Sequence, residues 1–392
     1  MKNEKKDLLI IGGGALGAFH AYHALEMGLK VTLLEKDTAP KSASVRNFGQ
    51  IVPSGMNQKW QAFGRKSLEV YAKLQSRADL GIMHGGSIYL ASDAAELQLL
   101  EELAKINRCN DYPSELLTPK ACLERYPCVQ PWYCKGGLYF PQELSVNPRT
   151  MVHRLLALLQ ENPNFKYLPN TLAKSIDSSG ATCKVSTANG DVHESEQVIL
   201  CSGTEFEHLY PGIFRNAGLV LVKIQMAKIK AQPNARIPGN ILTGLTVRRY
   251  ESFAECPAYH KIKADEDKDS FWKKWGIHLL FKQEADGSII LGDSHEYADW
   301  SMGETPDEFL REEVTRYFLD AGATILQLDH WQIESQWIGL YSQCKDKDIF
   351  QQTIDGKVHI VTGIGGKGMT GSAGFAFDHL SKLYGNDPNG CI

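Results

Sequence analysis

Short apolar runs that end in glycine alternate along this chain with stretches of helical periodicity. The first run, residues 8–11, is followed by Gly12, Gly14 and Gly17, and residues 18–26 are then good helix formers. A second apolar run at residues 30–34 follows them. This order predicts a strand, a tight turn, a helix and a second strand, which is the β-α-β unit of an α/β domain.

The same kinds of pattern continue to the end of the chain. Helical periodicity recurs at residues 58–78, 94–109, 118–126, 145–162, 305–318 and 372–383. Strands are predicted at residues 84–92, 136–141, 165–201, 219–232, 240–250, 275–280, 289–293, 333–341 and 358–361. Gly287 predicts a hairpin between the strands at 275–280 and 289–293.

Two further apolar runs end in small residues. Residues 198–203 read VILCSG, and residues 358–361 lead into TGIGGKGMT at 362–370, before the last helix. Glycine-rich junctions at opposite ends of the chain predict one discontinuous domain with the middle segments inserted. We expect one domain at residues 1–85, 140–218 and 338–392, and a second at 86–139 and 219–337.

Composition narrows the class of protein. The 392 residues are 43% hydrophobic and 22% charged, which is typical of a globular protein of two domains. A net charge of −4 without a long basic run argues against nucleic acid as a partner. No apolar run approaches the ~20 residues of a membrane span, and the polar start leaves no room for a signal peptide. Nine scattered cysteines predict reduced thiols in a cytoplasm, without disulfides or a metal site.

The first glycine turn has the spacing of a dinucleotide-binding site. Gly12 permits the tight turn, Gly14 lets a pyrophosphate approach the backbone, and Gly17 lets the helix pack against the strand. Glu35 ends the next strand, where its carboxylate can accept hydrogen bonds from a ribose. A glycine-rich turn of another α/β fold is the alternative interpretation.

With these three motifs, the chain resembles the D-amino acid oxidase superfamily of FAD-dependent oxidoreductases, on its glycine and sarcosine oxidase side. The resemblance implies FAD, a discontinuous Rossmann-like FAD-binding domain, and an α+β substrate domain built on an antiparallel sheet. VRNFGQ at residues 45–50 and LGDSHEYAD at 291–299 resemble a subgroup associated with the breakdown of 2-aminoethylphosphonate and N-methylated relatives.

The motifs and the loop at residues 41–55 together give the expected cofactor-binding residues, with an ordinary surface loop as the alternative for 41–55. These residues are Gly12, Gly14, Ala15, Leu16, Gly17, Glu35, Lys36, Arg46, Asn47, Gly49, Gln50, Cys201, Ser202, Gly203, Gly365, Gly366, Lys367, Gly368, Met369 and Thr370. Gly339 stands where the sarcosine oxidases carry the cysteine that tethers flavin, so we expect non-covalent FAD. Thr370 stands where those enzymes hold the substrate carboxylate with a lysine, so that clamp does not carry over.

Four residues are candidates for catalysis beside the flavin. His295 ends a predicted strand, where it can orient an amine or take its proton; a structural histidine is the alternative. Lys367 can add positive charge near the flavin, or be a solvated lysine. Trp337 and Tyr341 can form an aromatic wall or pack in the core. Another predicted strand end carries Arg248, Arg249 and Tyr250. These residues are candidates for binding an anionic substrate, with ordinary surface charge as the alternative.

The resemblance implies oxidation of the C–N bond of a small anionic amine by hydride transfer to flavin N5. The expected products are an imine, then an aldehyde or keto acid and an amine, with hydrogen peroxide when oxygen reoxidises the flavin. One alternative is an FAD-dependent dehydrogenase of a 2-hydroxy acid or polyol phosphate. A second is a non-catalytic nucleotide-binding or tRNA-modification partner. The choice of amine, the electron acceptor and the oligomeric state are left open.

Overall fold

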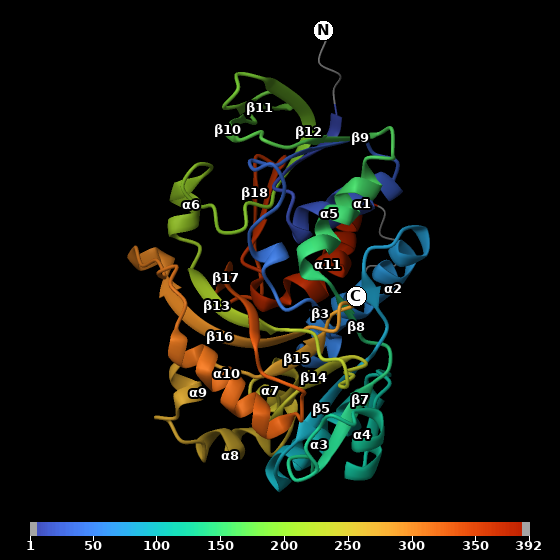
Figure 1. Cartoon of the computed structure of the whole chain (residues 1–392). Coiled ribbons are helices and arrows are strands. Elements are labelled where there is room, and N and C mark those ends of the chain that lie inside the picture. Colours follow the sequence, from blue (N-terminus) through green and yellow to red (C-terminus); the bar gives the residue numbers. More distant parts are fainter. Residues whose placement is uncertain (1–5, 386–392) are drawn as a thin grey trace.

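The computed structural model describes residues 6–385 and is built on two large β-sheets, one above the other in Figure 1. Each sheet has eight strands, and strands from both ends of the chain meet in the first one. A small third sheet of β3 (Gln50–Ile51), β8 (Leu144–Val146) and β4 (Ile82–Met83) lies between the other two. The mixed α/β fold class expected from the sequence is confirmed.

Parallel strands form the centre of the first sheet. Its strands are β1 (Lys6–Ile11), β2 (Val31–Leu34), β9 (Phe165–Leu168), β10 (Ala173–Asp177), β11 (Cys183–Thr187), β12 (Val192–Leu200), β18 (Phe350–Ile354) and β19 (Val358–Thr362). Strand β12 pairs in parallel with both β1 and β19. The carboxyl ends of these three strands therefore share one edge, although they come from positions near 11, 200 and 362.

Both faces of this sheet are buried, which explains its continuous apolar runs. Leu8 and Ile10 of β1 point into a core with helix α1 (Ala15–Glu26), while Leu9 and Ile11 point into the core on the other face. Helix α11 (Gly368–Leu383) packs on both α1 and α2 (Gln58–Arg77), and α5 (Pro148–Leu159) packs on α1. Figure 1 shows α1, α5 and α11 on the same side of the sheet.

The second sheet is mostly antiparallel. Its strands are β5 (Ser87–Ala91), β6 (Glu115–Leu117), β7 (Gly136–Phe140), β13 (Leu219–Ile229), β14 (Asn240–Leu242), β15 (Leu280–Gln283), β16 (Ile289–Asp299) and β17 (Ile333–Cys344). The long strand β13 lies between β16 and β17. The hairpin predicted around Gly287 is present as β15 and β16, with Leu280 opposite Gly292.

The remaining elements are distributed over both halves of the molecule. They are helices α3 (Ala94–Cys109), α4 (Pro119–Arg125), α6 (Pro211–Arg215), α7 (Gly244–Val247), α8 (Tyr259–Ala264), α9 (Phe271–Lys274) and α10 (Glu312–Ile325), and the 3₁₀ turns η1 (Ala43–Val45), η2 (Pro53–Gly55), η3 (Glu251–Glu255), η4 (Trp300–Met302) and η5 (Gly365–Lys367). The domain bounds stay a prediction, and β7 and β17 cross two of them.

Two predicted elements are wrong. The helix expected from residue 305 begins only at Glu312, because Asp307 pairs with the buried Lys223 of β13 and holds the preceding loop against the sheet. The strand expected over residues 240–250 ends at Leu242, and α7 follows it. Arg248 and Arg249 therefore lie after a helical turn rather than at a strand end.

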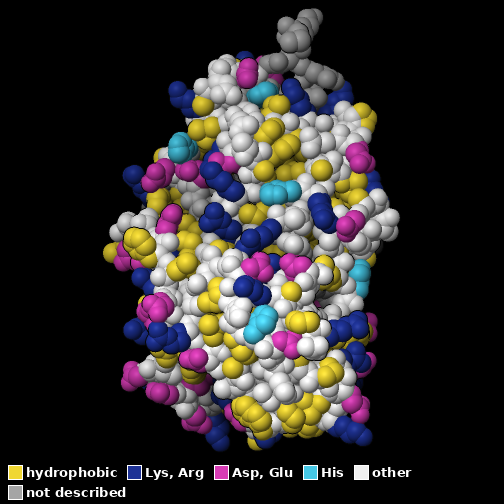
Figure 2. Space-filling model, in the orientation of Figure 1, with side chains coloured by type: hydrophobic (Ala, Val, Ile, Leu, Met, Phe, Trp, Pro, Cys, Tyr) yellow, Lys and Arg dark blue, Asp and Glu magenta, His cyan; other side chains and the backbone are white. Residues whose placement is uncertain are grey.

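The surface agrees with the modest net charge. Figure 2 shows basic and acidic side chains interspersed over one face of the molecule. Within residues 6–385, no helix is long and apolar enough to span a membrane. The eight cysteines in this range are free thiols, and Cys391 lies outside the described residues.

A cluster of buried histidines joins the two ends of the chain. His20 of α1 and His379 of α11 contact through their ring nitrogens at 2.9 Å, and a ring nitrogen of His23 donates to the Ala373 carbonyl oxygen at 2.9 Å. Burial lowers the pKa of His23 and of His379 to about 4. Both histidines are therefore neutral in the folded protein at neutral pH.

We predict that these histidines make the fold sensitive to acid. Between pH 6.5 and about 4 the unfolded chain binds protons that the folded chain does not, so stability falls as pH falls. His23 alone accounts for a loss of about 3 kcal/mol by pH 4. Urea unfolding of holoenzyme at pH 7.5 and pH 5 measures the loss, which His23→Gln reduces. The exposed His260→Gln is the control, and an unchanged pH dependence in His23→Gln contradicts the prediction.

Candidate active site

A long cavity of about 840 Å³ runs between the two sheets. The shared carboxyl edge of β1, β12 and β19 forms one wall, and β13, β15, β16 and β17 with the loop after α7 contribute to the other. This volume is in the range of cofactor and ligand sites. Ligands of open α/β sheets bind outside the carboxyl ends of the strands, where this cavity lies.

One end of the cavity is the turn between β1 and α1. Gly12 has φ +103°, and a Cβ atom there would lie 2.2 Å from the carbonyl oxygen of Cys201. A Cβ on Gly17 would lie 1.9 Å from the Gly12 carbonyl oxygen. Both positions therefore require glycine. Gly14 provides no side-chain cap for α1, and the Ala15 N–H donates to Ser44 Oγ at 2.9 Å, so the N–H groups of Leu16 and Gly17 are the ones available to a phosphate.

Glu35 lies at the end of β2, beside this turn. Its Oε2 accepts from the Gly13 N–H at 2.9 Å, and its Oε1 accepts from the Asp37 N–H at 3.0 Å. The carboxylate is 7% exposed and lines the cavity. Held in this way by two backbone donors, Glu35 has the position that a ribose hydroxyl requires.

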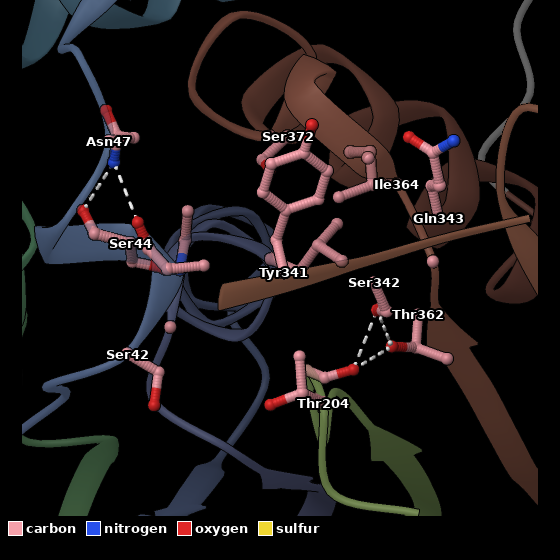
Figure 3. A pocket seen from close by; sticks show the side chains of 18 of the residues that line it. Ser42, Ser44, Asn47, Thr204, Tyr341, Ser342, Gln343, Thr362, Ile364 and Ser372 are labelled. Atoms are coloured by element: carbon pink, nitrogen blue, oxygen red, sulfur yellow. Dashed lines mark hydrogen bonds between the residues drawn. The ribbon is translucent and has the colours of Figure 1, made fainter. Parts of the chain in front are cut away.

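The second and third glycine junctions are joined by hydroxyl groups. Ser342 Oγ of β17 and Thr362 Oγ1 of β19 both donate to the Gly203 carbonyl oxygen, at 2.9 and 2.7 Å. Figure 3 shows these bonds beside Thr204, and Asn47 bonded to the backbone of the 41–55 loop. The loop after β12 is thereby fixed to the last strand of the same sheet.

The N-terminus of α11 forms the other end of the cofactor wall. No side chain caps this helix, so the positive end of its dipole faces the cavity through residues 366–370. Thr370 Oγ1 accepts from the Val52 N–H at 3.1 Å and fixes α11 to the small third sheet. Lys367 also lines the cavity, but its Nζ lies 2.6 Å from Glu251 Oε1 and 3.4 Å from Asp348 Oδ1.

The cavity wall carries polar atoms that the protein itself leaves unpaired. Gln50 Oε1, Ser202 Oγ and Ser372 Oγ are buried, line the cavity and have no hydrogen-bond partner among the described residues. Such atoms are rare in native proteins and indicate a bound polar group. With the N–H groups that remain free in the first turns of α1 and α11, they fit a dinucleotide that extends from α1 to α11, as FAD requires.

The opposite wall carries titratable residues. His278, Asp293 and His295 are buried beside one another, and Arg249 and Tyr250 lie next to them. Arg249 is half-buried; it donates to the Gly276 carbonyl oxygen at 3.1 Å and to the Tyr297 hydroxyl at 2.7 Å. Burial, followed by the positive charge of Arg249, lowers the pKa of His295 to about 3. His295 is therefore a neutral imidazole.

Most of the residues predicted from sequence meet at this cavity. Every expected cofactor residue lines it except Arg46, and His295, Tyr341 and Lys367 line it as well. Arg46 points to the outside and its Nη1 lies 3.5 Å from the Ile338 carbonyl oxygen. Trp337 is also outside the lining, since its Nε1 donates to the Arg46 carbonyl oxygen at 3.1 Å. The roles of all these residues stay predictions.

Sequence reasoning missed two members of the opposite wall. From the sequence alone, a turn-capping role for Asp293 is favoured over a catalytic one, and His278 is not distinguished within its predicted strand. The two lie 15 positions apart but share one hairpin, in which the His278 N–H donates to the Asp293 carbonyl oxygen at 3.1 Å. The hairpin pattern around Gly287 was the signal that could have placed them together.

Comparison with known proteins agrees with this geometry. The profile of the family described as FAD dependent oxidoreductase matches residues 7–377, nearly the whole chain. The solved glycine oxidase of Bacillus cereus is 18% identical, with a TM-score of 0.77 over 98% of this chain and 96% of that one. The FAD-bound L-α-glycerophosphate oxidase of Mycoplasma pneumoniae is 18% identical, with a TM-score of 0.75 over 98% of this chain and 97% of that one.

Similarity to curated proteins is more limited. Mitochondrial sarcosine dehydrogenase of Mus musculus is 24% identical over 146 residues, which are 36% of this chain. That match spans only 16% of the dehydrogenase, so the chain corresponds to a small part of this relative. The activity of sarcosine dehydrogenase is therefore not assigned to this protein from the match alone.

We predict that Gly12→Ala abolishes FAD binding. The added methyl group would meet the Cys201 carbonyl oxygen at 2.2 Å in a backbone conformation that alanine rarely adopts. We expect the FAD content per chain of the purified variant to fall at least tenfold, measured from its visible absorbance. Gly212→Ala, which adds a methyl group to open space, is the control. Full FAD occupancy in Gly12→Ala contradicts this account of the turn.

Proposed function

The chain belongs to the family of FAD-dependent oxidoreductases, and on this premise we propose that it oxidises the C–N bond of a small anionic amine. The amine is an N-methylated or primary amino acid or an aminophosphonate. When bound, FAD supplies the acceptor for the hydride that leaves the carbon next to nitrogen. The product imine hydrolyses to an aldehyde or keto acid and an amine, with hydrogen peroxide when oxygen is the electron acceptor.

The position of Arg249 is the observation that supports an anionic substrate. Its guanidinium lines the cavity, and within residues 6–385 no ion pair joins it to a carboxylate. The neighbouring Arg248, by contrast, pairs with Asp93 and Glu96 at 2.7 and 2.8 Å. A half-buried arginine without a counter-ion attracts an anion, and its planar fork suits a carboxylate or a phosphonate.

The other wall residues give the substrate its orientation. His295 lines the cavity, and because its Nδ1 is bonded to the Gly276 carbonyl oxygen, its Nε2 is the nitrogen that can accept from an amine N–H. Tyr341, on β17, is buried at the same wall, and burial raises the pKa of its hydroxyl well above the usual value, so it acts as a neutral hydrogen-bond donor. Gln50 Nε2 donates to the Tyr250 hydroxyl across the cavity, which limits the space between the two walls.

An FAD-dependent dehydrogenase of a 2-hydroxy acid or polyol phosphate is the second candidate. The fold similarity to the L-α-glycerophosphate oxidase of Mycoplasma pneumoniae favours it, and Arg249 suits the anion of either substrate class. The sequence similarity to sarcosine dehydrogenase favours the amine. The two candidates differ in the group that donates the hydride, so they are separated by direct reduction.

Anaerobic reduction of the holoenzyme tests the proposal. We expect the flavin absorbance to bleach with sarcosine, glycine, 2-aminoethylphosphonate or its N-methyl derivative, and not with glycolate, lactate or glycerol 3-phosphate. Hydrogen peroxide measured in air shows whether oxygen is the acceptor. Bleaching by hydroxy acids alone supports the second candidate, and no bleaching by any of the amines refutes the first.

We predict that Arg249→Met weakens substrate binding more than turnover. Loss of the guanidinium removes the counter-ion of the substrate, so KM for the best amine should rise at least about tenfold, with a smaller change in kcat. Steady-state kinetics with the amine found above measures both constants. Arg316→Met, on the exposed face of α10, is the control. An unchanged KM in Arg249→Met rules out Arg249 as the anion-binding residue.

A further inference from the structure

We propose that Asp293, His295 and His278 form a binding subsite for the protonated amine of the substrate, opposite the anion site at Arg249. This inference rests on the proposed function and makes it more specific, because it assigns the two ends of a zwitterion to two sets of side chains. The substrate class is then an amine whose nitrogen enters as a cation and whose other end is a carboxylate or phosphonate.

The carboxylate of Asp293 is the centre of this subsite. Asp293 is 7% exposed and lines the cavity. Its Oδ1 is paired with His278 Nε2 at 2.7 Å, while its Oδ2 accepts no hydrogen bond from the described residues and has His295 Nε2 beside it at 3.9 Å. The Oδ2 side of this buried carboxylate is therefore the side that a cation or a donor from a ligand can satisfy.

His295 adds a second acceptor. Its Nδ1 lies 2.9 Å from the Gly276 carbonyl oxygen, and because a carbonyl only accepts, Nδ1 carries the proton. In the neutral ring, Nε2 therefore presents a lone pair, and it lies 3.9 Å from Asp293 Oδ2. Two acceptors that face each other without a hydrogen between them repel, and a positively charged donor placed between them removes the repulsion.

His278 holds Asp293 in this position. It is 6% exposed, and its Nδ1 has no hydrogen-bond partner among the described residues. Its ring stacks on that of His295 with centroids 5.2 Å apart. We therefore assign His278 as a positioning residue, and Asp293 and His295 as the residues that contact the amine.

The spacing of the three residues suits a small cation. One nitrogen of each imidazole and one carboxylate oxygen lie within 4.8 Å of one another, with 2.7 Å between His278 Nε2 and Asp293 Oδ1 and 3.9 Å between His295 Nε2 and Asp293 Oδ2. Acceptors about 2.9 Å from a tetrahedral ammonium are about 4.7 Å apart, and ligands about 2.1 Å from one zinc ion are about 3.4 Å apart. The charge of the cavity and the metal measurement below, rather than the spacing, decide between the two.

The charges around the cluster also favour a zwitterion. Burial works to raise the pKa of Asp293, but the contact with His278 and the positive charge of Arg249 outweigh it and hold this pKa below its usual range. Asp293 is therefore ionised in the same cavity as the cationic Arg249. A ligand with one positive and one negative end compensates both charges, whereas a hydroxy acid compensates only Arg249.

Matched ligands test the subsite in the oxidised holoenzyme. Sarcosine is compared with butyrate and 2-aminoethylphosphonate with propylphosphonate, since each pair differs by a methylene or methyl group in place of the charged nitrogen. Dissociation constants come from anaerobic rapid mixing, in which the flavin absorbance change on binding is recorded before any bleaching. We expect the unaltered enzyme to bind at least one amine more tightly than its carbon analogue. Asp293→Asn should weaken binding of that amine at least about tenfold and leave the carbon analogue within about twofold.

Controls separate this subsite from general damage. Asp286→Asn changes a carboxylate in the turn of the same hairpin, outside the cavity, and should leave both affinities unchanged. Where Asp293→Asn loses FAD or folds poorly, His295→Phe keeps a flat ring, removes the acceptor nitrogen and should show the same selective loss. Equal weakening of both ligands, or no preference for either amine in the unaltered enzyme, overturns the proposal.

Two more outcomes have distinct meanings. One equivalent of tightly bound metal in the holoenzyme, lost in Asp293→Asn, overturns the ammonium assignment in favour of a metal site. Failure of the proposed function appears elsewhere: the amines then bind selectively through Asp293 but do not bleach the flavin. Bleaching by amines with unchanged selectivity in Asp293→Asn refutes the subsite while the proposed function stands.

Discussion

The close approach of the β1 turn to the carbonyl oxygen of Cys201 is the contact on which the cofactor wall depends. A side chain on Gly12 would overlap this oxygen, so the strand ends of β1 and β12 can meet only with glycine there. Strand β19 pairs with the other edge of β12 and brings the last glycine motif to the same place. One steric requirement near residue 12 thus brings together segments almost 200 and 350 positions away in the sequence.

The second sheet supplies the other half of the site in a different way. It provides charged groups that the cavity shields from bulk water. Charges interact more strongly in such a site than they do in water. Asp293 and Arg249 have opposite charges in this setting. Within residues 6–385 Arg249 forms no ion pair with a carboxylate, and the basic groups paired with Asp293 are the imidazoles of His278 and His295. The two opposite charges partly compensate each other within the cavity. Direct contacts with a ligand of opposite charge at each end stabilise both groups further.

The sequence predicts the cofactor wall better than the substrate wall, and the reason is physical. A dinucleotide is held by backbone groups at strand ends, and the glycines this requires are visible as spacing at residues 12–17. Asp293 and His278 act through their side chains. Strand register and a loop decide which residues lie next to these side chains, and no local sequence pattern indicates that arrangement. Trp337 shows the same limit: it lies on the same face of β17 as Tyr341, which lines the cavity, but the alternation does not say how far along the strand the cavity extends.

The start of α10 and the environment of Lys367 show how tertiary contacts override local preference. Residues 305–308 have the chemistry of a helix start, but Asp307 forms an ion pair with a lysine that is only 1% exposed, and this pair outweighs a capping interaction of about 1 kcal/mol.

For Lys367 the sequence leaves two possibilities, a positive charge near the flavin or a solvated lysine. Its ammonium is instead shared between Glu251 and Asp348, so it joins η3 and the β17–β18 loop to the start of α11. The positive potential at this end of the cavity therefore comes chiefly from the uncapped N–H groups of α11, which are fixed in place and cost no reorganisation when a negatively charged ring system binds. Because Glu251 follows Arg249 and Tyr250 closely in the chain, the same ion pair also fixes the loop that carries the anion site. Lys367 thus links the start of α11, at the cofactor end of the cavity, to the loop that carries the anion site at its substrate end.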